Sequence, residues 1–323
     1  MTALPLREWK LTQSARHRVS EFAAKAIAAV LPPRLMRSKR HFDVWQRRGY
    51  HVIPVHFYEP VPDTRELPSN IWEAPSETIG LDFRSNDQLV LLSRLVELQT
   101  EYDNLASAAE SNDGFFLNNG LFEAVDAEIF YSLIRIHRPR RIIEVGSGFS
   151  TLVALRALAQ NAAEDHPGEI TAFDPFPPTH LRDSRHGALT LRKFPIQDVD
   201  GHEFEALEPG DIFFVDSTHV LSIGSDVHCE LLEIVPRLRE GTFVHFHDIF
   251  LPYEYPRDWV LDEKRFWNEQ YALQAFLAFN DSFRVIWSSQ LMHRRHSPAL
   301  QAAFSSYDPL RHSPGSFWMR RVK

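Results

Sequence analysis

The sequence has little cysteine, no long apolar run and no excess of positive charge, and each lack excludes a class of protein. Cys229 is the sole cysteine among 323 residues, so the chain can form no internal disulfide and no cysteine-based zinc cluster. We therefore expect a cytoplasmic protein. The apolar stretch over residues 22–32 is shorter than the roughly 18 residues that span a bilayer. It also contains Lys25, so we expect no transmembrane segment and no signal peptide. The net charge of −8 argues against a nucleic-acid partner.

The charge that is present is unevenly distributed. Residues 1–50 hold 11 Lys and Arg against 3 Asp and Glu, although the whole chain is acidic. The pattern over residues 13–31 predicts a basic helix, which could contact an anionic membrane surface or pack its alanine-rich face on the rest of the protein. Residues 50–58 resemble an extended strand, and residues 89–109 have apolar side chains at helical spacing. We interpret residues 1–120 as an accessory region that covers the substrate, and residues 121–323 as the main domain.

From residue 121 the sequence alternates between helical patterns and short apolar runs. Such alternation predicts an α/β fold with a Rossmann-like, mostly parallel sheet covered by helices on both faces. No helix is expected between the last two strands, which predicts a terminal hairpin with one antiparallel strand. We expect seven strands, at residues 141–145, 170–173, 188–193, 212–215, 242–245, 283–287 and 316–322, and helices at residues 122–136, 152–159, 178–184, 226–238 and 263–279.

The motif that organises this pattern lies at the end of the first predicted strand. A buried apolar run is followed by Gly146, Ser147 and Gly148, and then Ser150 and Thr151 suit the start of a helix. Glycines allow a backbone to approach a ligand closely, and the first turn of a helix offers free N–H groups. A strand, a glycine turn and a helix start together predict a nucleotide-binding site.

The spacing Glu-x-Gly-x-Gly-x-Ser-Thr, which begins at Glu144, resembles motif I of the class I methyltransferases that use S-adenosyl-L-methionine (SAM). The resemblance covers about residues 120–323 and implies that the acid helps to hold the methionine amino group. A dinucleotide fingerprint would have glycine or alanine at Thr151, so an NAD-type oxidoreductase is the less favoured alternative. The resemblance implies SAM as the cofactor and, as its binding residues in this motif, Glu144, Gly146, Ser147, Gly148, Ser150 and Thr151.

Further polar residues follow the second and third predicted strands. Asp174 ends the second strand, where a carboxylate can accept both hydrogen bonds of a ribose diol. The resemblance assigns this position to the ribose of SAM. Gln197 and Asp198 follow the third strand, where members of the family often contact the adenine amine. The alternative is that Asp174 and Asp198 only cap local structure.

Two segments rich in histidine and aspartate end the fourth and fifth predicted strands. They resemble the metal sites of catechol-type O-methyltransferases, with His219 in the place of a lysine base. The resemblance implies a divalent cation, Mg²⁺ or another, bound by Asp216, His247 and Asp248. It also implies catalytic roles for His219, His247 and Asp248, because a hydroxyl must lose its proton to become a good nucleophile. Imidazole ligands would shift the preference toward Mn²⁺, Fe²⁺ or Zn²⁺. A metal-free enzyme with His247 as its base stays open, and His245 is expected in the core.

A segment rich in proline and aromatic residues follows Asp248, which predicts a wall or lid over the substrate. Its candidate substrate contacts are Tyr253, Tyr255, Trp267 and Gln270, although Trp267 could equally belong to the core. The basic residues within 288–314 could meet an acidic group on the acceptor or form a solvated loop.

Together these patterns predict a SAM-dependent methyltransferase that acts on a hydroxyl of a small-molecule acceptor, sugar-like or a related natural product. The rivals are a metal-dependent hydrolase or oxygenase, an NAD-type oxidoreductase, and a non-catalytic partner protein with the same fold. The sequence leaves open the acceptor, the metal and the oligomeric state, a homo-oligomer included.

Overall fold

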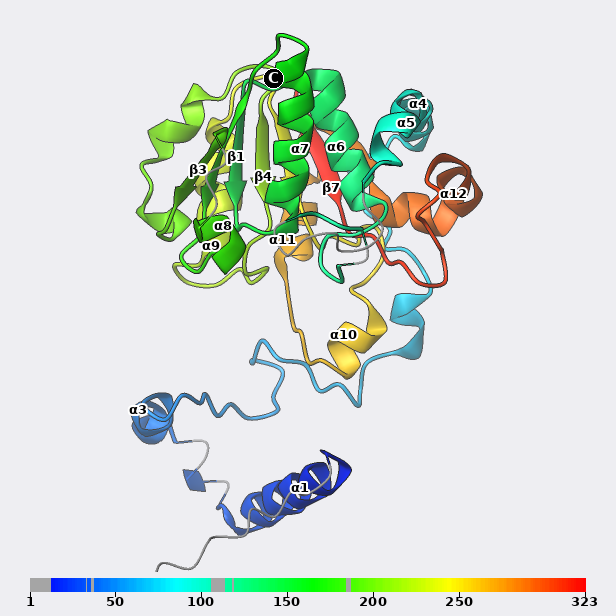
Figure 1. The fold of residues 1–323 in the computed structure, drawn as a ribbon. Coiled ribbons are helices and arrows are strands. Elements are labelled where there is room, and N and C mark those ends of the chain that lie inside the picture. Colours follow the sequence, from blue (N-terminus) through cyan, green and yellow to red (C-terminus); the bar gives the residue numbers. More distant parts are fainter. Residues whose placement is uncertain (1–12, 33, 36–37, 106–113, 118, 184–186) are drawn as a thin grey trace, which may run out of the picture. The chain divides into compact units, whose positions relative to one another are not determined.

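The structure is a computed structural model that describes residues 13–32, 34–35, 38–105, 114–117, 119–183 and 187–323. The chain divides into two compact units, residues 1–67 and 68–323, which are described separately (Figure 1). The first unit contains α1 (Gln13–Val30), η1 (Lys39–His41) and α3 (Phe42–Gln46). Helix α1 confirms the predicted N-terminal helix, and its Phe22 is 75% exposed. Contact of this helix with a membrane surface stays a prediction.

The second unit is built on a seven-stranded sheet with the strand order β3-β2-β1-β4-β5-β7-β6. Neighbours among β1 to β5 pair in parallel, whereas β7 pairs antiparallel with both β5 and β6. This arrangement confirms the predicted Rossmann-like sheet with one antiparallel strand. The order reverses between β1 and β4, where open sheets of this kind bind their ligands. The strands are β1 (Arg141–Val145), β2 (Glu169–Phe173), β3 (Leu189–Arg192), β4 (Ile212–Val215), β5 (Phe243–Phe246), β6 (Phe283–Ser288) and β7 (Phe317–Arg321).

Successive side chains of the central strands enter two different core layers. Ile142 and Phe214 pack in the layer that contains α6 and α7, whereas Ile143 and Phe213 pack in the layer on the other face. Because both faces are buried, these strands are continuous apolar runs in the sequence.

The helices of this unit differ in length. The longer ones are α4 (Ser85–Leu95), α6 (Asp126–His137), α7 (Phe149–Ala163), α11 (Glu269–Leu277) and α12 (Ser289–Ala303). The short ones are η2 (Ser69–Trp72), η3 (Val96–Leu98), α5 (Gln99–Tyr102), α8 (Thr179–Asp183), η4 (Ile196–Asp198), η5 (Gly201–Ala206), α9 (Asp226–His228), η6 (Cys229–Ile234), η7 (Val235–Arg237) and α10 (Arg257–Leu261).

The last two strands pair antiparallel, as predicted, but helix α12 lies between β6 and β7, so the expectation that no helix separates them is wrong. Ser288 begins the helix by accepting a hydrogen bond from the N–H of Leu291 at 3.2 Å. Leu291 and Leu300 are buried. The helix was hidden by its polar, basic middle and by Pro298, near which the chain kinks at His296 (φ −132°).

Other expected elements differ in length or regularity. Residues 50–58 form no strand, because a single extended segment with Pro54 lacks a neighbouring strand to complete its hydrogen bonds. The helix expected over residues 89–109 is α4, η3 and α5, and residues 106–109 lie outside the described part of the chain. The helix expected over 226–238 is α9, the π-helical η6 and η7, where Pro236 lacks a backbone donor.

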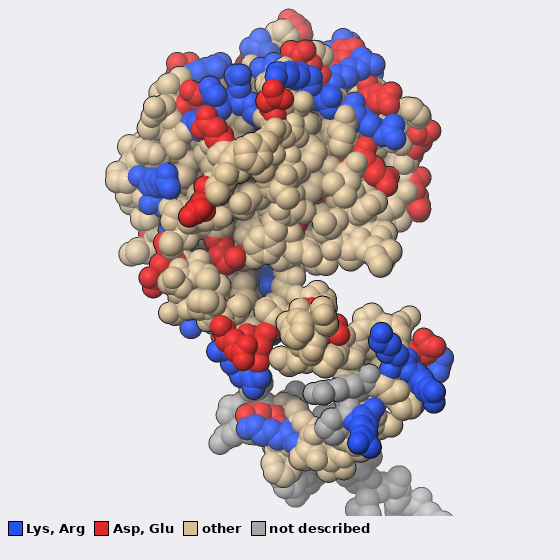
Figure 2. Space-filling model, turned by 180° about the vertical axis from the view of Figure 1, so that it is seen from behind, with Lys and Arg blue, Asp and Glu red and all other residues tan. Residues whose placement is uncertain are grey.

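The segment from residue 68 to residue 105 packs within the second unit. Gln88 Oε1 accepts a hydrogen bond from Ser288 N at 2.9 Å, and Tyr102 Oη donates to the carbonyl of Ala303 at 2.8 Å. A functional boundary near residue 120 stays a prediction. Among the described residues, every helix is too short or too polar to cross a bilayer. Charged side chains gather most densely at the upper end of this unit in Figure 2, opposite the carboxyl ends of the parallel strands.

Candidate active site

The turn between β1 and α7 contains two glycines with different roles. Gly146 has φ +86°, and a Cβ on it would lie 2.1 Å from the carbonyl oxygen of Asp216. Only glycine therefore lets the chain turn here against the end of β4. By contrast, a Cβ built on Gly148 meets no described atom within 4 Å apart from its neighbours in the chain. The second glycine leaves open space beside the first turn of α7, where a ligand can approach the backbone.

Glu144 is fully buried beneath this turn. Its carboxylate accepts hydrogen bonds from Ser150 Oγ at 2.5 Å and Thr151 Oγ1 at 2.6 Å, and Thr151 Oγ1 accepts one from Gly148 N at 3.0 Å. Burial raises the pKa of Glu144 to about 8, although the two hydroxyl donors act to lower it. The acid thus ties the start of α7 to β1. Its contact with the methionine amino group stays a prediction.

Asp174 lies beside the glycine turn at the end of β2. Its Oδ2 accepts a hydrogen bond from Ser147 Oγ at 2.6 Å, and its Oδ1 accepts one from Phe176 N at 2.7 Å. Gln197 and Asp198 are exposed in η4 at the end of the next strand. The structure therefore brings Ser147 and Asp174 together, while the adenine contact of Gln197 and Asp198 stays a prediction.

The ends of β4 and β5 bring together Asp216, His219, His247 and Asp248, which we name the His/Asp cluster. Nε2 of His219 lies 3.5 Å from Asp216 Oδ1 and 3.6 Å from Asp248 Oδ2. Nδ1 of His247 lies 3.8 Å from Asp216 Oδ1 and 3.4 Å from Asp248 Oδ1. Ligand atoms of Asp216, His219 and Asp248 all lie within 4.8 Å of one another, which is close enough for one cation. The cluster is joined to the glycine turn by the contact of Gly146 with Asp216.

Two buried acids that the sequence interpretation missed face the outer sides of the histidine rings. Glu269 Oε2 lies 2.9 Å from His219 Nδ1, and Asp126 Oδ2 lies 3.7 Å from His247 Nε2. Asp126 is held in place by hydrogen bonds from Ser289 Oγ at 2.6 Å and Gly315 N at 2.8 Å. Both acids come from distant parts of the chain, so no local spacing linked them to the histidines.

Within the cluster, Asp216 and the two histidines each favour the charged form of the other. Burial alone would lower the pKa of His219, but Asp216 and Glu269 outweigh it and hold the pKa well above its usual value. For His247, burial is likewise outweighed by Asp248 and Asp216, which raises the pKa to about 9. Burial opposes ionisation of Asp216, yet the two histidines lower its pKa to about 2. Burial raises the pKa of Asp248. The cluster therefore favours positive charge at its centre, carried by protons or by a cation.

His245 lies outside the cluster. It is fully buried, stacks on Phe214 with ring centroids 3.9 Å apart, and its Nε2 contacts Ser316 Oγ at 3.0 Å. Burial lowers its pKa well below the usual value, so the ring stays neutral. This histidine belongs to the core, as the sequence predicted.

A pocket of about 380 Å³ opens beside His247 and Asp248. Its wall contains charged groups of both signs and one large aromatic ring. The guanidinium of Arg265 lies 4.4 Å from the ring centre of Trp259 and pairs with Glu263 at 2.6 Å. Asp258 and Arg311 also line this pocket.

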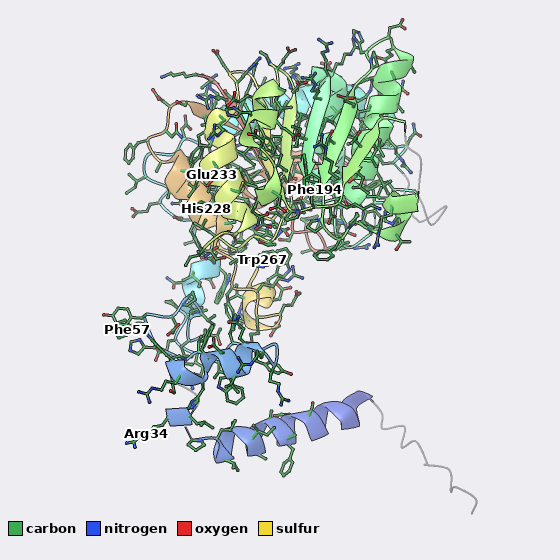
Figure 3. All side chains as sticks on the ribbon, turned by 90° about the vertical axis from the view of Figure 1, so that its left-hand side faces the viewer. Arg34, Phe57, Phe194, His228, Glu233 and Trp267 are labelled. Atoms are coloured by element: carbon green, nitrogen blue, oxygen red, sulfur yellow. The ribbon has the colours of Figure 1, made fainter. Side chains whose placement is uncertain are left out.

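Of the four predicted substrate residues, one contacts the His/Asp cluster and the other three are packed among themselves in the segment that follows Asp248. Tyr253, Tyr255 and Gln270 are buried, and Gln270 N donates to Tyr255 Oη at 3.1 Å. Trp267 packs against His219 in a tilted arrangement, with ring centroids 4.3 Å apart, and lies below the sheet in the view of Figure 3. None of the four is among the residues that line the pocket of 380 Å³, and their contact with substrate stays a prediction.

The basic residues of the segment from 288 to 314 do not act as one group. The guanidinium of Arg294 lies 4.8 Å from the ring centre of Tyr253, and His293 Nδ1 contacts Tyr307 Oη at 2.6 Å. Arg311 and His312, in contrast, line the pocket. Only the last two are therefore placed to meet an acceptor in that pocket.

Comparisons with known proteins identify the family of the chain. Residues 143–249 match the family model described as a methyltransferase domain. An uncharacterised protein of Archaeoglobus fulgidus is 32% identical over 170 residues, which cover 48% of this chain and 73% of the relative. The O-methyltransferase TomG of Streptomyces achromogenes, solved with SAM, is 15% identical, with 72% of this chain and 89% of that chain covered and a TM-score of 0.38. An O-methyltransferase of Bacillus cereus, solved with S-adenosylhomocysteine (SAH), is 15% identical, with coverages of 75% and 98% and a TM-score of 0.38. The chain belongs to the class I SAM-dependent methyltransferase family.

Proposed function

We propose that the protein transfers the methyl group of SAM to a hydroxyl oxygen of a small, polar acceptor, sugar-like or a related natural product. The observation that carries the proposal is the contact of Gly146 with Asp216, because it joins the glycine turn to the His/Asp cluster. A ligand held over the turn and an acceptor held over the cluster would then be neighbours. The match of residues 143–249 to a methyltransferase domain favours this reaction over hydride transfer or hydrolysis.

The cofactor side of the proposal uses the glycine turn and Asp174. SAM supplies a methyl group on a sulfonium that is already reactive. The open side of Gly148 lets the backbone approach the ligand, and the first turn of α7 offers N–H groups that have no partner within the helix. Asp174 is positioned by Ser147 to accept the hydrogen bonds of a ribose diol. These residues bind and align the donor, which is the main catalytic requirement of the transfer.

The acceptor side uses the His/Asp cluster. Its carboxylate and imidazole groups are donors that suit a divalent cation, with Asp216, His247 and Asp248 as the predicted ligands. A bound cation lowers the pKa of a hydroxyl. His247 and Asp248 line the pocket, so they lie where an acceptor hydroxyl would be bound. The pKa of His247 is raised to about 9, so its ring takes the hydroxyl proton only after it has lost its own, either above that pH or when a cation beside it displaces the proton. The pocket adds Asp258, Arg265 and Arg311, whose charges suit an acceptor with several polar groups.

The proposal is tested by incubating the purified protein with deuteromethyl SAM and a panel of catechols, glycosides and aliphatic polyols. We expect SAH to form together with a product that carries the labelled methyl on oxygen, as located by tandem mass spectrometry. Calorimetry should show binding of SAH and no binding of NADH. Tight binding of NADH, or a label found only on nitrogen or carbon, would contradict the proposal.

A further inference from the structure

The loop of residues 308–315 forms one wall of the pocket and ends against the His/Asp cluster. Gly315 N donates a hydrogen bond to Asp126 Oδ2 at 2.8 Å, and the carbonyl of Gly315 accepts one from Ile249 N at 2.9 Å. A Cβ built on Gly315 would lie 3.1 Å from the Cα of Asp248. A group bound by this loop and a hydroxyl bound by the cluster can therefore belong to one small acceptor.

The beginning of the loop is a tight turn. The carbonyl of Asp308 accepts hydrogen bonds from Arg311 N at 3.1 Å and His312 N at 2.9 Å, and Asp308 Oδ1 accepts one from Leu310 N at 2.9 Å. The loop backbone is thus held at both ends, although the side chain of Arg311 is exposed. A wall that is fixed before the ligand arrives lowers the entropy cost of binding.

His312 supplies a hydrogen-bond donor to this wall. Asp308 N donates to Nδ1 of the ring at 2.9 Å, so Nδ1 carries a lone pair. The carbonyl of Asp308 lies farther from the same nitrogen, at 3.2 Å, so the contact with the N–H decides the tautomer. The ring proton is therefore on Nε2. His312 lines the pocket, and within the described part of the chain no group accepts a hydrogen bond from its Nε2.

Arg311 supplies a positive charge that no acid offsets. Its guanidinium has no ion-pair partner and no hydrogen-bond acceptor among the described residues, although it lines the pocket. The other arginine of the pocket, Arg265, pairs with Glu263 at 2.6 Å. Of the remaining acids outside the cluster, Glu123 accepts a backbone hydrogen bond at 2.8 Å, whereas Asp258 is exposed. The unused donors of the pocket wall are therefore concentrated at residues 311 and 312.

We infer that Arg311 and His312 form a subsite for a carboxylate, so that the acceptor is a hydroxy acid whose hydroxyl lies at the His/Asp cluster. The inference rests on the proposed function and narrows its substrate class. A guanidinium can donate to both oxygens of a carboxylate, and the imidazole adds another donor. A phosphate group suits the pocket less well, because its charge of about −1.5 to −2 would meet Asp258 and the acids of the cluster. The volume of about 380 Å³ suits a small molecule.

The first test compares acids with uncharged partners of similar shape. The protein loaded with SAH is titrated calorimetrically with 3,4-dihydroxybenzoate and its primary amide, with methyl glucuronoside and methyl glucoside, and with glucose 6-phosphate. We expect at least one acid to bind about 10- to 100-fold more tightly than its uncharged partner, which corresponds to hydrogen bonds with a charged group. Equal or tighter binding of both uncharged partners, no binding of either acid, or a preference for the phosphate over both acids would overturn the inference.

The second test assigns the preference to the subsite. Arg311→Gln should lower the affinity for the preferred acid about 10- to 100-fold, and Arg311→Lys, which keeps the charge but loses the planar fork, should recover part of it. Asp258→Asn should raise that affinity, because it removes a repelling charge. The matched control is Arg295→Gln. Arg295 is an exposed arginine of α12 outside the pocket, so its substitution changes the net charge equally and should leave the acid affinity unchanged.

SAH affinity is measured on every variant, because it reports whether the fold is intact. An unchanged acid preference in Arg311→Gln, a fall in Asp258→Asn, or an equal fall in Arg295→Gln would overturn the subsite. So would a label found on the carboxylate as a methyl ester, because that would place the acid at the methyl donor.

The inference and the proposed function can fail separately. Methylation of uncharged hydroxyl acceptors in preference to the acids would overturn the subsite and leave the proposed function standing. Selective binding of an acid through Arg311, without any methyl transfer, would do the reverse.

Discussion

The backbone of Gly146 lies directly against that of Asp216, so the glycine turn and the His/Asp cluster are adjacent in the structure. A Cβ on Gly146 would approach the carbonyl oxygen of Asp216 to 2.1 Å, and the residue has φ +86°. The contact couples the glycine turn to the His/Asp cluster, because a change in the turn would displace the end of β4 and, with it, Asp216.

The two glycines of the turn should respond differently to alanine. In Gly146→Ala the Cβ meets backbone and the φ value is unfavourable, so the free energy of unfolding should fall by more than about 2 kcal/mol. In Gly148→Ala the Cβ enters open space, so stability should be kept while SAH affinity falls. Denaturant unfolding and calorimetry with SAH measure the two effects. Equal loss of stability in both variants would contradict this assignment of roles.

Substitutions of Asp174 and His247 should have different effects, one on cofactor affinity and the other on turnover. Asp174→Ala removes the carboxylate held by Ser147 and should weaken SAH binding by about 10- to 100-fold, which corresponds to one or two hydrogen bonds to a charged group. His247→Ala should bind SAH normally and lose turnover. Calorimetry and a coupled SAH-release assay measure both. Normal SAH affinity in Asp174→Ala would contradict the assignment of the ribose to Asp174.

Glu144 should make stability depend on pH. The pKa of its buried carboxyl is raised from 4.5 to about 8, so the folded protein keeps a proton that the unfolded chain releases. The contribution of this group to the free energy of unfolding is therefore fully present below about pH 4.5. It is lost as the pH rises toward 8, at about 1.4 kcal/mol per pH unit. Glu144→Gln, which mimics the protonated form, should gain stability relative to the wild type over that interval.

The measurement for Glu144 is the free energy of unfolding of both proteins at several pH values between 4.5 and 8. Their difference should change steadily in favour of the variant. A difference that stays constant with pH would mean that the carboxyl is ionised in the folded protein.

Removal of residues 1–67 should leave the cofactor site intact. Every residue of the glycine turn and of the His/Asp cluster lies in the second unit, residues 68–323. We therefore expect the shortened chain to keep its SAH affinity. If turnover of a bound acceptor falls while SAH affinity is kept, the first unit belongs to the cover predicted for residues 1–120. Loss of SAH binding would show that the two units are not independent in this respect.

Much of the fold was predictable because it depends on local patterns. The strands around Ile142 and Phe213 are buried on both faces, which makes them continuous apolar runs. Helix α12 was missed because basic residues and Pro298 interrupt its apolar face, and its buried side chains have partners only in the folded protein. The substrate contacts assigned to Tyr253 and Gln270 depended on an aromatic lid whose packing no spacing reveals.

The sequence alone determined the glycine turn, the order of the seven strands along the chain, and the positions of Asp174, Asp216, His219, His247 and Asp248 at strand ends. Each of these follows from neighbours in the chain, through backbone freedom or side-chain periodicity. Only the tertiary structure decided which groups face the histidine rings, because Asp126 and Glu269 reach them from distant helices. Ring orientation, buried charge and the size of the space between donors are properties of contacts across the fold.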